Sequence, residues 1–277
     1  MRRFWACLPL SVALGATGFA GPLPLQDLLK NAGPAVVHLS VRDAADEEEG
    51  SGSGFVVSED GRIVTNHHVI DGARRVIAVF ADGKEVEVVG VWAFSESDKD
   101  DIAIVQLAPG SYPALRLAAA PAQQGDEVAV IGSPHGLSPA ITTGIVAAVR
   151  EHGTVTKRTK DGPESWGLQI TAGIAPGSSG SPILNASGDV VGVAVGTWGG
   201  TANFGVPVAR VRKLTETKGA TLDRIRPLSE ARGGPSRRTN LLVSAALFGA
   251  IGLAWWLSGR KSRSATKPAG GWRPSGR

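Results

Sequence analysis

Residues 52–65 read GSGFVVSEDGRIVT and hold the pattern that decides the fold. Two short apolar runs, 55–57 and 63–65, stand on either side of the turn residues 59–61, Glu-Asp-Gly. Short apolar runs rich in β-branched residues and separated by a glycine-containing turn are typical of neighbouring strands. The stretch therefore predicts a β-hairpin.

The same pattern recurs through most of the chain. Further short apolar segments occur at 36–41, 76–80, 85–89, 102–107, 128–131, 141–149, 168–171, 190–195 and 204–208. Many short strands at near-regular spacing indicate an all-β domain built as barrels or as a sandwich. Helices are expected only at 25–32 and 208–217, and the acidic run 43–49 is expected to be a solvated loop.

The net charge of +4 over 277 residues is unevenly distributed. Residues 21–220 hold 16 Lys and Arg against 23 Asp and Glu, a balance of −7, whereas 258–277 hold six basic residues and no acid. Because the basic residues gather at the ends, the charge does not indicate a nucleic-acid partner. The single cysteine, Cys7, excludes a disulfide scaffold and a cysteine-based metal cluster, and we expect neither a metal nor a cofactor.

Both ends of the chain resemble membrane-targeting segments. Residues 1–20 place two arginines before an apolar run and small residues, which predicts a secretory signal peptide. Residues 241–257 form the centre of an uncharged stretch long enough to span a bilayer as a helix, with Trp255 and Trp256 near one end. The expected order is the signal peptide, a domain at 21–218, a linker at 219–240, a transmembrane helix and a basic tail at 258–277.

The signal peptide sets the orientation of this arrangement. The central domain is expected on the extracytoplasmic side of the membrane, and the basic tail in the cytoplasm. After removal of residues 1–20 the chain has no cysteine, which favours export into a bacterial cell envelope over an animal secretory route. We therefore expect a single-pass protein of the bacterial inner membrane whose domain faces the periplasm.

Three segments carry residues that are reactive in combination. They read IVTNHHVI at 63–70, SDKDDIAIV at 97–105 and PGSSGSPI at 176–183. Together they supply histidine, aspartate and serine, in that order. Serine becomes a nucleophile when an imidazole takes its proton, and the imidazole needs a carboxylate to fix its tautomer. Glycines around a serine allow backbone N–H groups to converge on a developing oxyanion.

These segments resemble the trypsin-like serine proteases of the HtrA, or DegP-like, family. That family has T-N-x-H-V, D-[IL]-A-[VL] and G-N-S-G-G-P-[LI], and here the segments read TNHHV at 65–69, DIAI at 101–104 and GSSGSPI at 177–183. The glycine-rich 52–57, IGSPHGL at 131–137, TGIV at 143–146 and NFGVP at 203–207 match as well. The resemblance covers about residues 26–215. It implies two six-stranded antiparallel β-barrels, about 26–120 and 121–215, with the active site in the cleft between them.

The resemblance also assigns roles to particular residues. It implies that His68 is the general base, Asp101 orients it, Ser179 is the nucleophile, and the N–H groups of Gly177 and Ser179 form the oxyanion hole. His67 is the alternative base, but it occupies the variable position of the motif. Since neighbours on a strand point to opposite faces, only one of the two histidines is expected to face the cleft. For the same motif reason Asp98 and Asp100 are weaker candidates than Asp101.

Several positions depart from the digestive enzymes of this class. The residue before the nucleophile is Ser178 rather than an aspartate, so activation by propeptide cleavage is not indicated. Ser181 replaces the second glycine of the motif. Gly173 stands where trypsin has an acid, which predicts no preference for cleavage after Lys or Arg. Ile174 suggests an aliphatic pocket.

Residues 197–199 (Thr197, Trp198 and a glycine) are a candidate edge for pairing with extended substrate, or alternatively a packed surface tryptophan. About 25 residues separate the expected domain from the membrane segment, too few for the PDZ domains usual in the family. The leading hypothesis is a membrane-anchored serine endopeptidase that acts on protein or peptide substrates by acyl-enzyme chemistry. The alternative is a non-catalytic or chaperone-like peptide-binding module on the same fold. The family also suggests a homo-oligomer, often a trimer.

Overall fold

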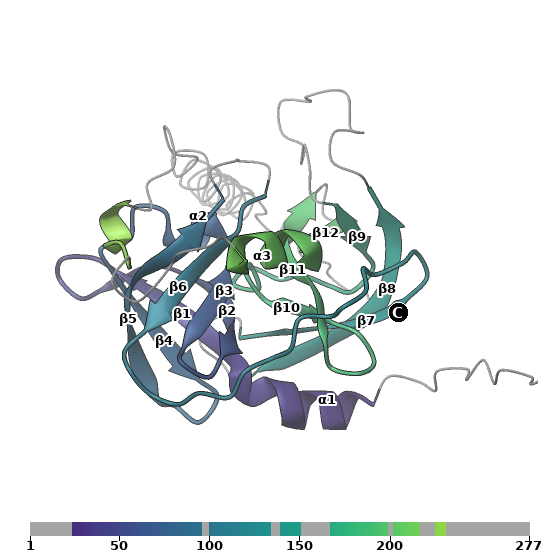
Figure 1. Ribbon diagram of the computed structural model, residues 1–277, viewed down its shortest axis with the longest axis horizontal. Helices are drawn as coiled ribbons and strands as arrows, with labels where there is room; N and C mark the ends of the chain where they lie inside the picture. Colours follow the sequence, from purple (N-terminus) through teal and green to yellow (C-terminus); the bar gives the residue numbers. More distant parts are fainter. Residues whose placement is uncertain are drawn as a thin grey trace, which may run out of the picture. The chain divides into compact units, whose positions relative to one another are not determined.

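The computed structural model describes residues 24–95, 100–133, 139–150, 167–198, 202–216 and 225–230. Within them the chain forms two closed barrels of six antiparallel strands each (Figure 1), as the resemblance implied. The segments expected as a signal peptide, a transmembrane helix and a basic tail lie outside the described residues. Among the helices that are described, none is long and apolar enough to cross a membrane.

The first barrel has the strand order β1-β2-β3-β6-β5-β4 and the second β10-β11-β12-β9-β8-β7. The first consists of β1 (Val36–Arg42), β2 (Glu48–Ser58), β3 (Arg62–Thr65), β4 (Arg75–Phe80), β5 (Glu85–Phe94) and β6 (Ala103–Leu107). The second consists of β7 (Glu127–Gly132), β8 (Ala140–Val149), β9 (Leu168–Ile170), β10 (Pro182–Leu184), β11 (Val190–Trp198) and β12 (Ala202–Pro207). The acidic run expected as a loop is partly a strand, because β2 begins at Glu48, where Arg42 of β1 pairs with it.

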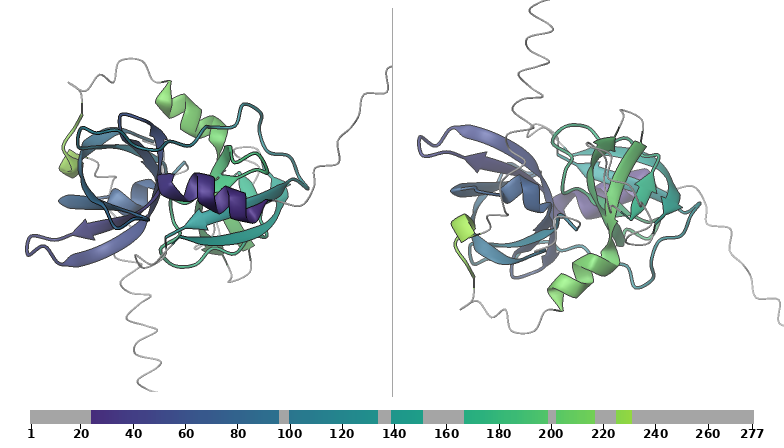
Figure 2. Two further views of the ribbon diagram at one scale, coloured as in Figure 1. Left: turned by 90° about the horizontal axis from the view of Figure 1, so that it is seen from below. Right: turned by 90° about the horizontal axis from the view of Figure 1, so that it is seen from above.

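Helices are short and lie outside the barrels. They are α1 (Leu25–Ala32), the 3₁₀ turn η1 (Gly33–Ala35), α2 (His67–Ile70), α3 (Val208–Thr215) and the 3₁₀ turn η4 (Leu228–Glu230). The first expected helix is confirmed, and the second ends two residues earlier than expected. Figure 2, in the view from below, shows α1 lying across the place where the barrels meet.

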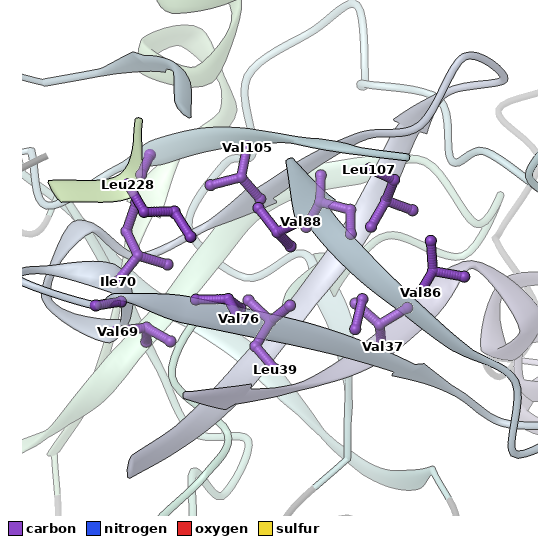
Figure 3. Close-up of a cluster of buried hydrophobic side chains, with 14 of the residues drawn as sticks. Val37, Leu39, Val69, Ile70, Val76, Val86, Val88, Val105, Leu107 and Leu228 are labelled. Carbon is purple, nitrogen blue, oxygen red and sulfur yellow. The ribbon is translucent and has the colours of Figure 1, made fainter. Parts of the chain in front are cut away.

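Three strands of the first barrel, β1, β3 and β6, bury both of their faces. In β6, Ala103, Val105 and Leu107 point into the barrel, and Ile104 belongs to a second buried cluster shared with the other barrel. Neighbouring strands alternate in the same way, with Ile63 inside the barrel and Val64 in the shared cluster. A strand buried on both faces needs no polar residue in its interior, so it reads as a continuous apolar run. Figure 3 shows part of the interior cluster of the first barrel.

Candidate active site

His68 and Asp101 are held together at one end of the first barrel. The ring nitrogen Nδ1 of His68 lies 2.6 Å from Oδ2 of Asp101, and the backbone N–H of His68 donates to Oδ1 at 2.9 Å. The second bond fixes the carboxylate in the plane that the ring requires. Since the carboxylate accepts at Nδ1, that nitrogen carries the proton and Nε2 is left with its lone pair.

The backbone of Asp101 is held as firmly as its side chain. Its carbonyl accepts from the side-chain amide of Asn66 at 3.0 Å and from the N–H of His67 at 3.1 Å. Its φ is +42°, in the left-handed region that few non-glycine residues occupy. Such strain persists only where the surroundings over-determine the conformation, which is a common property of functional sites. Four hydrogen bonds to residues 66–68 provide that surrounding here.

His67 and His68 lie in the one-turn helix α2 and not on a strand, so the strand argument used to separate them was wrong. In a helix, adjacent residues point about 100° apart. His68 faces Asp101, whereas the ring of His67 stacks on Phe94 with centroids 4.9 Å apart and planes 3° from parallel. The two histidines therefore have different partners, Asp101 for His68 and Phe94 for His67.

Of the other two acids of the segment, the structure describes only Asp100. Asp98 is outside the described residues. Asp100 forms an ion pair with Arg210 of α3 and accepts a long bond from the Ser95 hydroxyl at 3.4 Å. Burial lowers the pKa of Arg210, since its guanidinium is largely withdrawn from water. Asp100 therefore links the loop that carries Asp101 to a helix of the other half of the domain.

Ser179 lies in a tight turn of the second barrel. The turn is closed by bonds from Ser178 N to Ala175 O at 2.9 Å and from Gly180 N to Ala194 O at 2.9 Å. Gly177 and Gly180 have φ of +87° and +90°, which a residue with a side chain would rarely adopt. The hydroxyl of Ser179 donates to the carbonyl of Val195 at 2.8 Å.

Ser53 joins this turn to the first barrel. Its N–H donates to the carbonyl of Ser179 at 2.8 Å, and its hydroxyl donates to the carbonyl of Gly177 at 2.8 Å. The same hydroxyl accepts from Ser133 N at 3.2 Å, and the Ser53 carbonyl accepts from the Thr65 hydroxyl at 2.7 Å. Sequence reasoning assigned no role to Ser53 or Thr65. Their signal was the pair of glycines around Ser53, which lets the backbones approach closely.

Ser178 and Ser181 are both buried against Gly132. Ser181 is fully buried, and its hydroxyl has no hydrogen-bond partner among the described residues. A Cβ placed on Gly132 would lie 2.7 Å from this hydroxyl and 3.2 Å from that of Ser178. The serine that replaces the second glycine of the motif is therefore accommodated by the glycine opposite it.

The residues expected to bind substrate lie on two segments of the second barrel. The carbonyl of Gly173 accepts from the Thr142 hydroxyl at 2.8 Å, and Ile174 is half-buried against the core of that barrel. Thr197 and Trp198 are the last residues of β11, where they pair with Asn203 and Ala202 of β12. Among the described strands, the pairing of β10 with β11 does not extend beyond Val193, so the following residues of β11 have one edge without a neighbouring strand.

No group of three or more residues able to hold a metal ion occurs in the part of the chain that the structure describes.

Two β-barrels that bring a histidine–aspartate pair and a glycine-flanked serine turn to their junction define the class of two-barrel serine peptidases. Residues 52–193 match the family model described as a trypsin-like peptidase domain, and this chain belongs to that family.

Relatives named as serine proteases are found in both bacteria and animals. The chain is 35% identical over 150 residues to a DegP-like periplasmic serine endoprotease of Halomonas elongata, covering 54% of this chain and 30% of the relative. It is 32% identical over 199 residues to the serine protease HTRA1 of Xenopus laevis, covering 69% and 42%. The crystal structure of the serine endoprotease from Yersinia pestis superposes with a TM-score of 0.59 at 26% identity, covering 71% of this chain and 67% of that one. The chain thus spans less than half the length of these two relatives.

Proposed function

We propose that this protein is a serine endopeptidase in which His68 is the general base, Asp101 orients it and Ser179 is the nucleophile. The observation that carries the proposal is the two-point contact between Asp101 and His68, through both Nδ1 and the backbone N–H. A carboxylate in that position holds the imidazole in the tautomer in which Nε2 carries no proton, and it stabilises the imidazolium that forms. Membership of the trypsin-like peptidase family and relatives named serine proteases support the same assignment.

The chemistry follows from these positions. Nε2 of His68 takes the hydroxyl proton of Ser179 as Oγ forms a bond to the scissile carbonyl carbon, and the π-electron pair moves onto the carbonyl oxygen. The tetrahedral intermediate collapses as the C–N bond breaks, and His68 returns the proton to the leaving amine. Water then attacks the acyl-enzyme with His68 again acting as base, and the Ser179 hydroxyl is restored.

The Ser179 hydroxyl must turn before this reaction begins. It donates to the Val195 carbonyl, which competes with donation to an imidazole. A rotation about the Cα–Cβ bond of Ser179 moves the hydroxyl between staggered positions without moving the backbone. We propose that substrate binding along β11, the strand to which Val195 belongs, favours the rotated position.

We assign the oxyanion hole to the N–H groups of Gly177 and Ser179. The bonds that close the turn use the N–H groups of the residues that follow these two, Ser178 and Gly180. The Gly177 carbonyl is held from behind by the Ser53 hydroxyl, so the turn is supported by the first barrel. One donor of this kind contributes about 3–4 kcal/mol to stabilising the transition state.

For the substrate we propose an extended peptide that pairs with the last residues of β11, near Thr197 and Trp198, and places a side chain beside Gly173 and Ile174. Residues 165–188 contain no acid, so cleavage after small or medium aliphatic residues is expected over cleavage after Lys or Arg. A library of peptides varied at the position before the cleaved bond tests this preference. Preferential cleavage after Lys or Arg would overturn it.

We further propose that the domain at 21–218 is exported by a signal peptide at 1–20, connected by the linker 219–240 and held in the inner membrane by a helix at 241–257, with 258–277 in the cytoplasm. Relatives from Halomonas elongata and Chlamydia trachomatis are named periplasmic, which agrees with an envelope location. Unfolded or loop segments of envelope proteins are the substrates proposed, and a homotrimer is the assembly proposed.

The proposal is tested by labelling the full-length protein, purified in detergent, with a fluorophosphonate probe that reacts with activated serines. The parent protein should be labelled, and Ser179→Ala and His68→Ala should abolish labelling. The matched control is Ser187→Ala, at an exposed turn residue of the same barrel, which should label like the parent. Labelling that persists in Ser179→Ala would refute the assignment of the nucleophile.

A second candidate function, peptide binding without cleavage, draws on the bond between the Ser179 hydroxyl and the Val195 carbonyl. That function predicts no labelling of the parent protein, together with capture of an unfolded protein that His68→Ala leaves unchanged. Labelling of the parent excludes it.

A further inference from the structure

Residues 225–229 return from the second barrel to the first and dock on β5; we call them the strap. The N–H of Val91 donates to the Arg226 carbonyl at 2.8 Å, and the N–H of Arg226 donates to the Val91 carbonyl at 3.0 Å. These two residues form an antiparallel bridge outside the barrel strands. The strap lies within the segment expected as a polar linker, so part of that segment belongs to the folded domain.

A glycine on β5 makes room for the strap. A Cβ on Gly90 would collide with the Ile225 side chain and lie 2.5 Å from the Arg226 carbonyl oxygen. Contacts under 3.0 Å are essentially never seen for real Cβ atoms, so any side chain at position 90 would displace the strap. Gly90 therefore provides a way to undock the strap without changing any residue in it.

Leu228 places its side chain in the core of the first barrel. It is only 7% exposed and belongs to the same buried cluster as Val69 and Ile70 of α2. Figure 3 shows Leu228 next to Ile70 at one end of this cluster, with Leu107 at the other end. The strap thus packs beside Ile70, the second residue after His68.

Arg226 acts on the residue that precedes His68. Its guanidinium carbon lies 4.7 Å from the centre of the Phe94 ring, and Phe94 stacks on His67 with ring centroids 4.9 Å apart. Phe94 therefore stacks between Arg226 and His67. His67 is the first residue of α2, the helix that carries the proposed base His68. A cation over an aromatic ring contributes about 0.5–1 kcal/mol at an exposed site.

From these contacts we infer that the strap is a positioning element for His68. The helix α2 is four residues long, and a helix of one turn is not stable by itself, so its orientation depends on what packs against it. The strap is linked to both sides of the base, through Phe94 to His67 before it and through Leu228 to Ile70 after it. Leu228 and Arg226 are positioning residues, and Asp101 remains the partner that touches the imidazole. The inference rests on the proposed role of His68.

The inference is tested in the full-length protein with Leu228→Ala and with Gly90→Ala, which undocks the strap from the opposite side. The control is Leu107→Ala, at the far end of the same cluster. Peptide hydrolysis gives kcat and KM, the fluorophosphonate reaction gives the acylation rate, and a melting curve gives Tm. At a temperature well below Tm, we expect Leu228→Ala and Gly90→Ala to lower kcat and the acylation rate about tenfold and to leave KM unchanged. The control Leu107→Ala should lose a comparable amount of Tm but keep kcat within about twofold of the parent.

Two conservative variants separate positioning from folding. Leu228→Met keeps the apolar volume and should restore most of the rate lost in Leu228→Ala. Arg226→Lys keeps the positive charge and should restore most of the rate lost in Arg226→Ala. Because Arg226 is exposed, Arg226→Ala should fold even if Leu228→Ala does not. Strap variants that lose Tm but keep the parent's kcat would overturn the inference, as would an equal loss of kcat in Leu107→Ala. A parent protein that is not labelled at Ser179 would instead refute the proposed function.

Discussion

At the scale of single residues, Asp101 is held by several constraints at once. Its carboxylate serves the side chain and the backbone of His68, its carbonyl serves Asn66 and His67, and its own backbone is left-handed. Asparagine tolerates the left-handed region and has nearly the same shape as aspartate. The charge at this position can therefore be removed with little change in the fold.

Asp101→Asn is expected to lower kcat by about 10³–10⁴-fold, because the amide favours the wrong tautomer of His68 and stabilises no imidazolium. Tm should change little, and hydrolysis of a peptide substrate together with a melting curve measures both effects. Asp100→Asn, one residue earlier, is the comparison for a local change in charge. A kcat for Asp101→Asn within about tenfold of the parent would contradict the role assigned to this carboxylate.

Ser181 is one of the residues at which the chain departs from the family motif, and its buried hydroxyl has no hydrogen-bond partner in the described structure. Removing an unsatisfied buried polar group recovers its desolvation penalty, so Ser181→Ala should stabilise the protein by about 1 kcal/mol. For a domain of this size the melting temperature should rise by about 2–4 °C. Ser187→Ala is the control at an exposed serine, and a fall in Tm for Ser181→Ala would show that this hydroxyl is bonded in solution.

At the scale of elements, strands were predictable and the connections between them were not. The runs at 36–41, 63–65 and 102–107 became β1, β3 and β6 because a strand buried on both faces is mainly apolar, with few buried polar residues such as His38 and Gln106. The turn α2 was missed, since four residues are too few to show a helical period. The start of β2 at Glu48 was missed because charged residues on the exposed part of a strand resemble a loop.

The candidate site could likewise be predicted only in part from the sequence. Motifs identified His68, Asp101 and Ser179 because side-chain chemistry depends on residue type. Ser53, Asn66 and Arg210 escaped notice because they act through contacts between residues far apart in the chain, which spacing along one sequence does not record. The contact between Ser53 and Gly177, for example, joins residues 124 positions apart.

The ion pair between Asp100 and Arg210 links α3 to the loop that carries Asp101, and the side chains of Asp100 and Arg210 are 25% and 16% exposed. Arg210→Met should therefore lower the free energy of unfolding by about 2 kcal/mol, because the partly buried carboxylate of Asp100 loses its ion-pair partner. The surface pair between Arg116 and Asp189 provides a control, since Arg116 is 80% exposed. Arg116→Met should cost less than about 0.5 kcal/mol.

Urea denaturation measures both variants, and Asp100→Asn combined with Arg210→Met completes a double-mutant cycle. The pair should couple strongly, and added salt should reduce that coupling little because the pair is partly buried. Equal losses for Arg210→Met and Arg116→Met would contradict a special role for the link to α3.

At the scale of the whole molecule, the two barrels meet where the turn of Ser179 contacts Ser53. Gly180 has a left-handed backbone, and a Cβ there would run into the carbonyl of Ser53 and lie 2.5 Å from the hydroxyl of Thr65. The absence of a side chain at this position allows the second barrel to touch the first. Ser53 and Thr65 therefore form the surface against which the turn of Ser179 packs.

Gly180→Ala should lower the free energy of unfolding by about 3 kcal/mol, through backbone strain and the collision between barrels together. Gly83→Ala isolates the strain, because Gly83 has a φ of +84° but its Cβ would meet nothing within 4 Å. That control should lose only about 1 kcal/mol. Urea denaturation measures the free energy of unfolding of both variants. Equal losses of that free energy would show that the contact between the barrels accommodates a side chain at position 180.

The position of the strap in the chain has a consequence for how a new molecule matures. Every strand of both barrels is translated before Leu228, so a growing chain can close its barrels while the turn of His68 still lacks its last packing partner. Hydrolytic competence would then arrive only after all the described strands have been synthesised, once residues 225–229 reach β5. The order of these elements along the chain would therefore delay the reaction until the strap has been made.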